Sequence, residues 1–114
     1  MKIGFIGVGK MATAIINGLN TTSHDIIISG SSLPRSREIA EQLEVEAALS
    51  HQELIDQSDL VVLGIKPQMF ETVLTGLHFH QPILSMAAGV TLERLGKLTD
   101  PNLPLIRIMP NLNA

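Results

Sequence analysis

Short apolar segments alternate with helical segments along the whole chain, and this order constrains the fold more than any other feature of the sequence. The apolar segments are continuous runs rather than alternating patterns, as expected for parallel strands covered on both faces. They are residues 2–6, 25–29, 45–49 (a brief one), 59–65, 82–87 and 103–109. We therefore predict an α/β protein, with a Rossmann-type, doubly wound, mainly parallel sheet and helices on both faces.

Helical patterns fill the intervals between the apolar segments. They cover residues 10–19, 34–43, 50–58, 70–77 and 91–98. Ser50 and Glu53 have capping-box spacing, so each side chain is expected to bond the other residue's backbone N–H. The residues expected on the buried face of the first helix are Met11, Ala14, Ile15 and Leu19.

Composition limits the classes of function. The chain has 114 residues, a net charge of −3, three aromatic residues and no cysteine. This length suits one domain, without a basic excess for nucleic acid, a disulfide framework or a thiolate metal site. No apolar run approaches the roughly 18 residues that span a bilayer, and no secretory signal is visible. We predict one NAD(P)-binding domain over residues 1–114, in the cytoplasm, without a nucleic-acid or membrane partner.

Candidate catalytic and metal-binding side chains are few. His78 and His80 have H-x-H spacing, but no third ligand lies near them in the sequence, so no metal site is predicted. No Ser-His-Asp arrangement or poised general acid is visible. The catalytic residues are therefore unknown at this stage.

The segment GVGKMA (7–12) is the main functional signal. It reads G-x-G-x-x-A, directly after a predicted strand and at the start of a predicted helix. Gly7 would permit the tight turn, Gly9 would let a pyrophosphate reach the backbone, and Ala12 would keep helix and strand close. The helix N-terminus offers free N–H groups to the phosphates. We predict dinucleotide binding, and the alternative is a strand-to-helix turn without a ligand.

The end of the second strand indicates which dinucleotide is bound. NAD-preferring proteins place an acid there, whereas this chain reads SGSSLPRSR (29–37), with no acid before Glu38. Hydroxyls of Ser31 and Ser32 and the guanidinium of Arg35 or Arg37 would bind a 2′-phosphate. NADP is therefore favoured and NAD remains possible. In the alternative interpretation, the two arginines are solvated residues of a first helical turn.

Four segments together resemble the pyrroline-5-carboxylate reductase family. They are FIGVGKMATAI (5–15), VVLGIKPQ (61–68), ILSMAAGVTLERL (83–95) and RIMPN (107–111). Many dehydrogenases share the first segment, but the other three are more particular, and all four occur in order along the whole chain. The family reduces 1-pyrroline-5-carboxylate to L-proline in the final step of proline biosynthesis, by hydride transfer from nicotinamide C4 to the C=N carbon.

The resemblance also implies which residues bind the cofactor. Residues 6–11 would line the pyrophosphate, Ser31 the 2′-phosphate, 64–67 the nicotinamide ribose and 86–88 the nicotinamide ring. Asn111 would be an amide partner near the nicotinamide or substrate. Together with the residues inferred above, the expected cofactor-binding set is Ile6, Gly7, Val8, Gly9, Lys10, Met11, Ser31, Ser32, Arg35, Gly64, Ile65, Lys66, Pro67, Met86, Ala87, Ala88 and Asn111. His51 stands where the family often has asparagine, which leaves its role open.

Family members continue past M-P-N into a helical domain that forms the dimer and completes the active site. The resemblance therefore implies that these residues are the cofactor domain, inactive alone, of a homo-oligomeric enzyme with a small-molecule substrate. Two other classes remain open. One is another NADP-dependent reductase, of the beta-hydroxyacid dehydrogenase or deazaflavin-linked NADP oxidoreductase type, against which I-K-P-Q and R-x-M-P-N argue. The other is a non-catalytic nucleotide-sensing domain.

Overall fold

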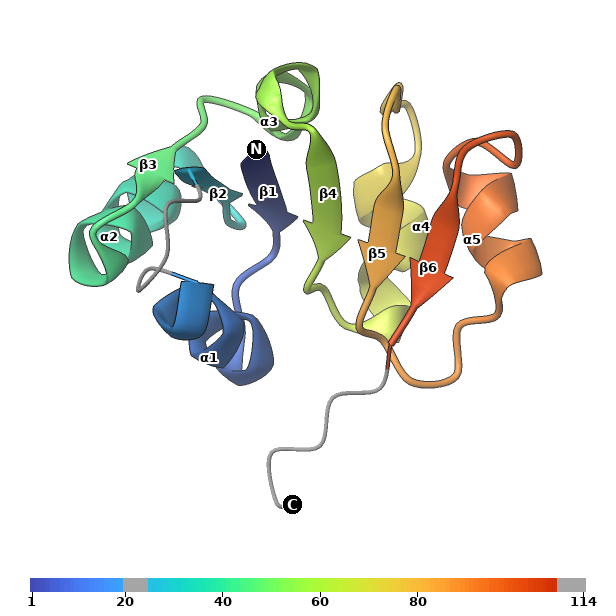
Figure 1. The fold of residues 1–114 in the computed structure, drawn as a ribbon, viewed down its shortest axis with the longest axis horizontal. Helices are drawn as coiled ribbons and strands as arrows, with labels where there is room; N and C mark the ends of the chain where they lie inside the picture. Colours follow the sequence, from blue (N-terminus) through green and yellow to red (C-terminus); the bar gives the residue numbers. More distant parts are fainter. Residues whose placement is uncertain (20–24, 109–114) are drawn as a thin grey trace.

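Six parallel strands form one sheet in the order β3-β2-β1-β4-β5-β6 (Figure 1). The structure is a computed structural model and describes residues 1–19 and 25–108. The strands are β1 (Lys2–Ile6), β2 (Asp25–Ser29), β3 (Glu46–Ala47), β4 (Leu60–Leu63), β5 (Ile83–Ser85) and β6 (Leu105–Arg107). The helices are α1 (Lys10–Leu19), α2 (Leu33–Leu43), α3 (His51–Gln57), the 3-10 turn η1 (Pro67–Met69), α4 (Phe70–Leu74) and α5 (Leu92–Leu98). The predicted doubly wound, parallel α/β fold is confirmed.

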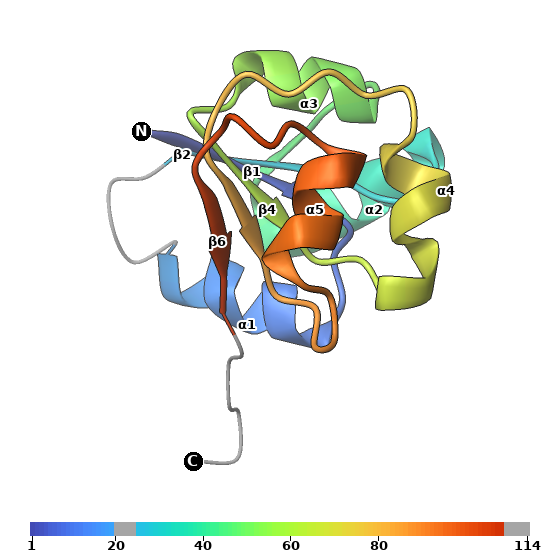
Figure 2. The same cartoon turned by 90° about the vertical axis from the view of Figure 1, so that its right-hand side faces the viewer.

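Helices cover both faces of the sheet, and the strand residues divide between two cores. On β1, Phe5 packs with α1 and α2, whereas its neighbour Ile6 packs with α3, α4 and α5. Successive strand side chains point to opposite faces, so a continuous apolar strand serves both cores. Figure 2 shows α1 and α3 on opposite sides of the strands. No helix within residues 1–19 and 25–108 is long and apolar enough to cross a membrane.

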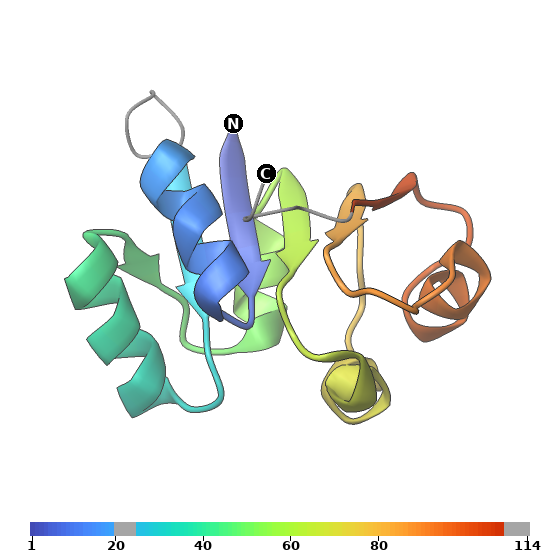
Figure 3. The same cartoon turned by 90° about the horizontal axis from the view of Figure 1, so that it is seen from below.

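The reversal of strand order lies between β1 and β4. The chain winds outward from β1 through β2 to β3, and then returns through α3 to β4 on the other side of β1. The strands are parallel, so their carboxyl ends lie along one edge of the sheet. Figure 3, which shows the molecule from below the view of Figure 1, has the arrowheads of β1 and β4 pointing the same way. Open α/β sheets bind ligands at this kind of switch point.

The expectation for the buried face of α1 was wrong at one residue. Ala14 is exposed, while Ala12 and Ile16 are the residues of this helix that lie deepest in the core. Met11, Ile15 and Leu19 pack at the edges of that stripe. The face of α1 that packs on the sheet is therefore centred on the i, i+4 pair Ala12 and Ile16, one or two positions away from the face predicted from the sequence.

Two other local expectations needed correction. The helix expected over residues 70–77 ends at Leu74, because Thr75 is extended and Gly76 has a φ of +88°. Of the two hydrogen bonds expected for the Ser50–Glu53 capping box, the structure shows one. The Ser50 hydroxyl accepts the Glu53 N–H at 3.1 Å, but the Glu53 carboxylate accepts a hydrogen bond from Gln57 Nε2.

Candidate functional site

A pocket of about 320 Å³ lies at the switch point of the sheet. The loops that follow β1, β2 and β4 build its floor, and α2, α3, η1 and α4 contribute its walls. Its lining residues are Gly7, Val8, Gly9, Gly30, Ser31, Arg35, Ile39, His51, Gly64, Ile65, Lys66, Met69 and Val73. The lining thus joins the glycine loop to the end of the second strand, as the sequence predicted for a dinucleotide site.

The loop after β1 is held from two sides. The Gly7 N–H donates to the Ser29 carbonyl of β2 at 2.8 Å, and the Gly64 N–H donates to the Ile6 carbonyl at 2.8 Å. Gly7 has a φ of +82°, a conformation that side chains rarely adopt. A Cβ on Gly9, in contrast, would have no atom within 4 Å. Gly7 is thus required by the turn itself, whereas Gly9 leaves open space above the backbone.

Gly64 lets the loops after β1 and β4 approach each other. A Cβ at this position would lie 2.4 Å from the Gly7 carbonyl oxygen and 3.3 Å from the Met86 terminal methyl. The first of these is a backbone atom, which cannot move away without disturbing the turn. The glycine is therefore needed for packing between the two loops that form the pocket.

Gly64→Ala is expected to destabilise the fold. Overpacking against backbone costs about 2–3 kcal/mol, so the free energy of unfolding should fall by that amount and the Tm by roughly 10 °C or more. Chemical and thermal denaturation followed by circular dichroism would measure the change. Gly18→Ala is the matched control, because Gly18 is exposed on α1 and a Cβ there has no atom within 4 Å. Equal stability of the two variants would contradict this account of Gly64.

Hydroxyl groups and one guanidinium gather after β2. Ser31 and Arg35 line the pocket, and Ser32 lines a smaller adjoining one together with Ser31 and His51. Ser32 is the N-cap of α2, and its hydroxyl oxygen accepts the Arg35 N–H at 3.3 Å, which leaves the hydroxyl proton for a ligand. The Arg35 side chain pairs with Glu38 at 2.9 Å, and both side chains are exposed. Such surface pairs contribute about 0–1 kcal/mol, so a stronger anion can draw the guanidinium away.

The charge of the pocket suits an anion. Arg35 and Lys66 line it, and none of its described lining residues is acidic. His51, the first residue of α3, is half-buried in the wall, and this burial lowers the pKa of its ring below the ordinary value. Its Nδ1 lies 2.6 Å from the Ser29 hydroxyl oxygen. The lowered pKa favours the neutral imidazole near pH 7.

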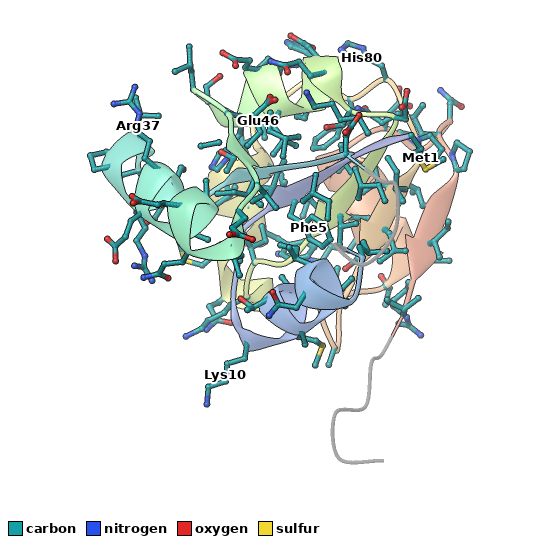
Figure 4. All side chains as sticks on the ribbon, turned by 60° about the vertical axis from the view of Figure 1, so that its left-hand side comes forward. Met1, Phe5, Lys10, Arg37, Glu46 and His80 are labelled. Carbon is teal, nitrogen blue, oxygen red and sulfur yellow. The ribbon has the colours of Figure 1, made fainter. Side chains whose placement is uncertain are left out.

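The pocket brings together part of the predicted cofactor-binding set. The predicted residues in its lining are Gly7, Val8, Gly9, Ser31, Arg35, Gly64, Ile65 and Lys66. Of the others, Ile6 is fully buried in the core, and Met11, on α1, is partly buried against the core on that face of the sheet. Lys10 and Pro67 are exposed, and Figure 4 shows Lys10 extending from the start of α1 into solvent. Asn111 lies outside the described residues.

The three residues predicted beside the nicotinamide lie after β5, next to this pocket rather than in its lining. Met86 and Ala87 are buried and Ala88 is exposed. The Met86 N–H donates to the Leu63 carbonyl at 3.3 Å, which places this turn against the end of β4. Their role at the nicotinamide stays a prediction.

Of the five pocket residues outside the predicted set, His51 was named with its role left open, and four others were not predicted from the sequence as site residues. They are Gly30, Ile39, Met69 and Val73. Gly30 could have been found as the residue that directly follows β2, since parallel strands end at one edge. The three apolar residues lie on α2, η1 and α4, and only the placement of these elements over the pocket reveals them.

The two histidines with H-x-H spacing take no part in this site. His80 Nε2 lies 2.9 Å from an Asp56 carboxylate oxygen, and the His78 backbone exchanges hydrogen bonds with Gln52. The hydrogen bond from His80 lowers the pKa of the Asp56 carboxyl, with a further lowering from Gln52. Within the described part of the chain, no group of three or more His, Cys, Asp or Glu side chains could hold a metal ion.

The fold and the pocket together define a Rossmann-type α/β domain with a cationic, glycine-floored site at its switch point. The chain belongs to the family described as NADP oxidoreductase coenzyme F420-dependent, whose model matches residues 2–89. The family match thus covers the first four strands, the pocket loops and β5.

Similar proteins confirm the resemblance drawn from the four sequence segments. The chain is 34% identical to the pyrroline-5-carboxylate reductase of Staphylococcus epidermidis, a match that covers 100% of this chain and 45% of that protein. Among solved structures, the 1-pyrroline-5-carboxylate reductase of Streptococcus pyogenes is 69% identical, with a TM-score of 0.96, over 99% of this chain and 44% of that one. The reductase of Coxiella burnetii is 28% identical, with a TM-score of 0.78, over 96% of this chain and 43% of that one. The chain therefore spans about half the length of the relatives it matches.

Proposed function

We propose that residues 1–114 bind NADP(H) and form the cofactor half of a pyrroline-5-carboxylate reductase. The observation that carries the proposal is the pocket at the switch point, where open space above Gly9 adjoins Ser31 and Arg35 without an acidic neighbour in the lining. The 69% identity to the Streptococcus pyogenes reductase supports the choice of reaction. When bound, the cofactor would supply a hydride from nicotinamide C4 to the imine carbon of 1-pyrroline-5-carboxylate.

The residues present fit the cofactor's phosphates. A pyrophosphate placed over Gly9 would meet the free N–H groups at the start of α1, which has no acidic residue in its first turn. A 2′-phosphate near Ser31 would have hydroxyl donors and the Arg35 guanidinium within the same pocket system. The apolar wall of Ile65, Met69 and Val73 offers a surface for a flat ring.

We propose that this chain binds and orients the dinucleotide cofactor. Its loops would fix the dinucleotide along the strand ends, and Met86, Ala87 and Ala88 would border the nicotinamide. The substrate pocket and the group that delivers a proton to the imine nitrogen would belong to a further domain. We also propose that the whole enzyme is cytoplasmic and homo-oligomeric.

Titration with NADPH and NADH tests the proposal. We expect the fluorescence of NADPH to change in intensity or wavelength when it binds. Its dissociation constant should lie in the micromolar range and be lower than that of NADH. No binding up to about 1 mM of either cofactor, near the upper end of enzyme KM values, would contradict the proposal.

The family description favours a second candidate, an oxidoreductase that links NADP to coenzyme F420. Both candidates require NADP(H) binding in the same pocket, so cofactor titration does not separate them. An assay of the whole protein does: proline formation from 1-pyrroline-5-carboxylate supports the first, and reduction of F420 by NADPH with no proline formed supports the second.

Arg35→Ala is expected to weaken NADPH binding by about tenfold to a hundredfold, because a charge-assisted bond to phosphate contributes roughly 1.5–3 kcal/mol. Binding of NADH should change by less than about twofold, since it lacks the 2′-phosphate. Isothermal titration calorimetry would give both values.

Arg37→Ala is the matched control for this experiment. Arg37 lies on the same helix, is exposed, does not line the pocket and projects outward in Figure 4. The Arg37→Ala substitution removes the same positive charge without removing the proposed contact to the 2′-phosphate. Equal losses for NADPH and NADH in Arg35→Ala, or equal effects of the two variants, would exclude Arg35 from the 2′-phosphate site.

A further inference from the structure

The Ser29–His51 pair joins the end of β2 to the wall of the pocket. Ser29 is the last residue of β2 and is 3% exposed, and its hydroxyl oxygen lies 2.6 Å from His51 Nδ1. His51 lines both the main pocket and the adjoining smaller one, so this residue lies where the two adjoin. The hydroxyls of Ser31 and Ser32 line the smaller pocket beside it. The imidazole therefore borders the place proposed for the 2′-phosphate.

The hydrogen bond to Ser29 determines which nitrogen faces a ligand. His51 is the partner of the Ser29 hydroxyl among the described residues, so the hydroxyl proton is best placed on Nδ1 of a neutral ring. The ring proton then resides on Nε2, which has no hydrogen-bond partner in the described part of the chain. In both the neutral ring and the imidazolium, Nε2 can therefore donate to an anion.

Burial opposes a charge on the His51 ring until an anion arrives. Arg35 from α2 and Lys66 from the loop after β4 line the same pocket, and both are cations. The nearby acids have other partners: Glu38 pairs with Arg35, and Glu53 on α3 accepts from Gln57. Burial is what lowers the pKa of the His51 ring. The free protein therefore holds His51 in its neutral form near pH 7.

We propose that His51 is a protonatable ligand of the cofactor's 2′-phosphate, taking up one proton from solvent when the phosphate binds; this inference rests on the proposed NADP(H) function. The added proton resides on Nδ1, and the Ser29 hydroxyl changes from donor to acceptor, a change that a hydroxyl allows. Nε2–H then donates to a phosphate oxygen. A phosphate carries a charge of about −1.5 to −2 near pH 7, which favours the imidazolium beside it.

Proton uptake should distinguish the two cofactors. NADH presents a ribose hydroxyl at this place, which lacks the charge needed to stabilise an imidazolium. NADPH affinity should rise as the pH falls from about 8 to 6.5, because the bound state has the higher histidine pKa and thus binds more protons. An increase of about threefold to fourfold over this range corresponds to a pKa rise of about one unit. NADH affinity should be nearly flat over this range.

Calorimetry in two buffers of different ionisation enthalpy tests the proposal on the 114-residue chain. We expect wild-type protein to take up about a quarter to half a proton more with NADPH than His51→Gln does at pH 7. Glutamine keeps an N–H donor but cannot be protonated, so NADPH should still bind, with most of the pH dependence lost. The phosphate's own titration is common to both proteins and cancels in the comparison.

His78→Gln is the matched control, since His78 is exposed and lies outside both pockets. It should take up protons as the wild type does. NMR titration of the His51 ring would show its pKa raised by NADP⁺ but unchanged by NAD⁺. Equal uptake by wild type and His51→Gln, or no rise in the His51 pKa with bound NADP⁺, would overturn the inference while leaving the proposed function standing. Failure of both cofactors to bind wild type would instead overturn the proposed function.

Discussion

Gly9→Val is expected to abolish dinucleotide binding while the fold remains as stable as before, within about 1 kcal/mol. A Cβ on Gly9 has no atom within 4 Å, and the residue lines the pocket. The Cβ of the new side chain would therefore meet no neighbouring atom, and the isopropyl group would fill the space that a pyrophosphate needs. We expect the affinities for NADPH and NADH to fall together by more than a hundredfold, or about 2.7 kcal/mol.

Gly18→Val provides the matched control for this variant. It makes the same change on an exposed turn of α1, outside the pocket, where a Cβ also has no atom within 4 Å. Titration with both cofactors and thermal unfolding of the two variants would separate the effects. Undiminished cofactor affinity in Gly9→Val would mean that the turn is structural and carries no ligand.

The glycines show how far sequence reasoning reaches into the fold. The motif alone predicted that Gly7 supplies a tight turn, and the φ of +82° at Gly7 confirms it. The need for glycine at position 64 was not derivable, because it arises from a carbonyl oxygen that is 57 residues away in the sequence and 2.4 Å from the would-be Cβ. Local patterns report local backbone conformation, whereas close approach between loops depends on how the strands pair.

The same distinction applies to the site. Ser31, Arg35 and Lys66 could be grouped in advance, because they follow parallel strands whose carboxyl ends share one edge of the sheet. Met69 and Val73 could not, since their positions depend on how η1 and α4 cross above the pocket. The predicted buried face of α1 was also imprecise. Each residue turns a helix by about 100°, so an error of one or two positions assigns the wrong residues to the core: Ala14 is exposed, and Ala12 and Ile16 are buried.

The largest expected effect concerns turnover by residues 1–114 alone. We expect this chain to bind NADPH with an affinity within about tenfold of a complete reductase, and to form proline at no measurable rate. The binding contacts proposed for the pyrophosphate and 2′-phosphate all lie within residues 7–51, so they do not depend on a further domain. The chain spans 44% of the Streptococcus pyogenes enzyme, which offers a full-length comparison at 69% identity.

Geometry gives the reason for the loss of turnover. In the proposed function, the strand ends would offer one surface for the nicotinamide, with Met86, Ala87 and Ala88 along it, and the proposed reaction would also require an opposing wall to seat the imine and exclude water. Correct positioning of two reactants can contribute about 7–11 kcal/mol to lowering a barrier, so a one-sided site should lose most of the rate. NADPH binding and proline formation would be measured for this chain and for the full-length Streptococcus pyogenes enzyme. Turnover by residues 1–114 within tenfold of the complete enzyme would show that a second wall is unnecessary, and the active site would then have to lie entirely on this domain.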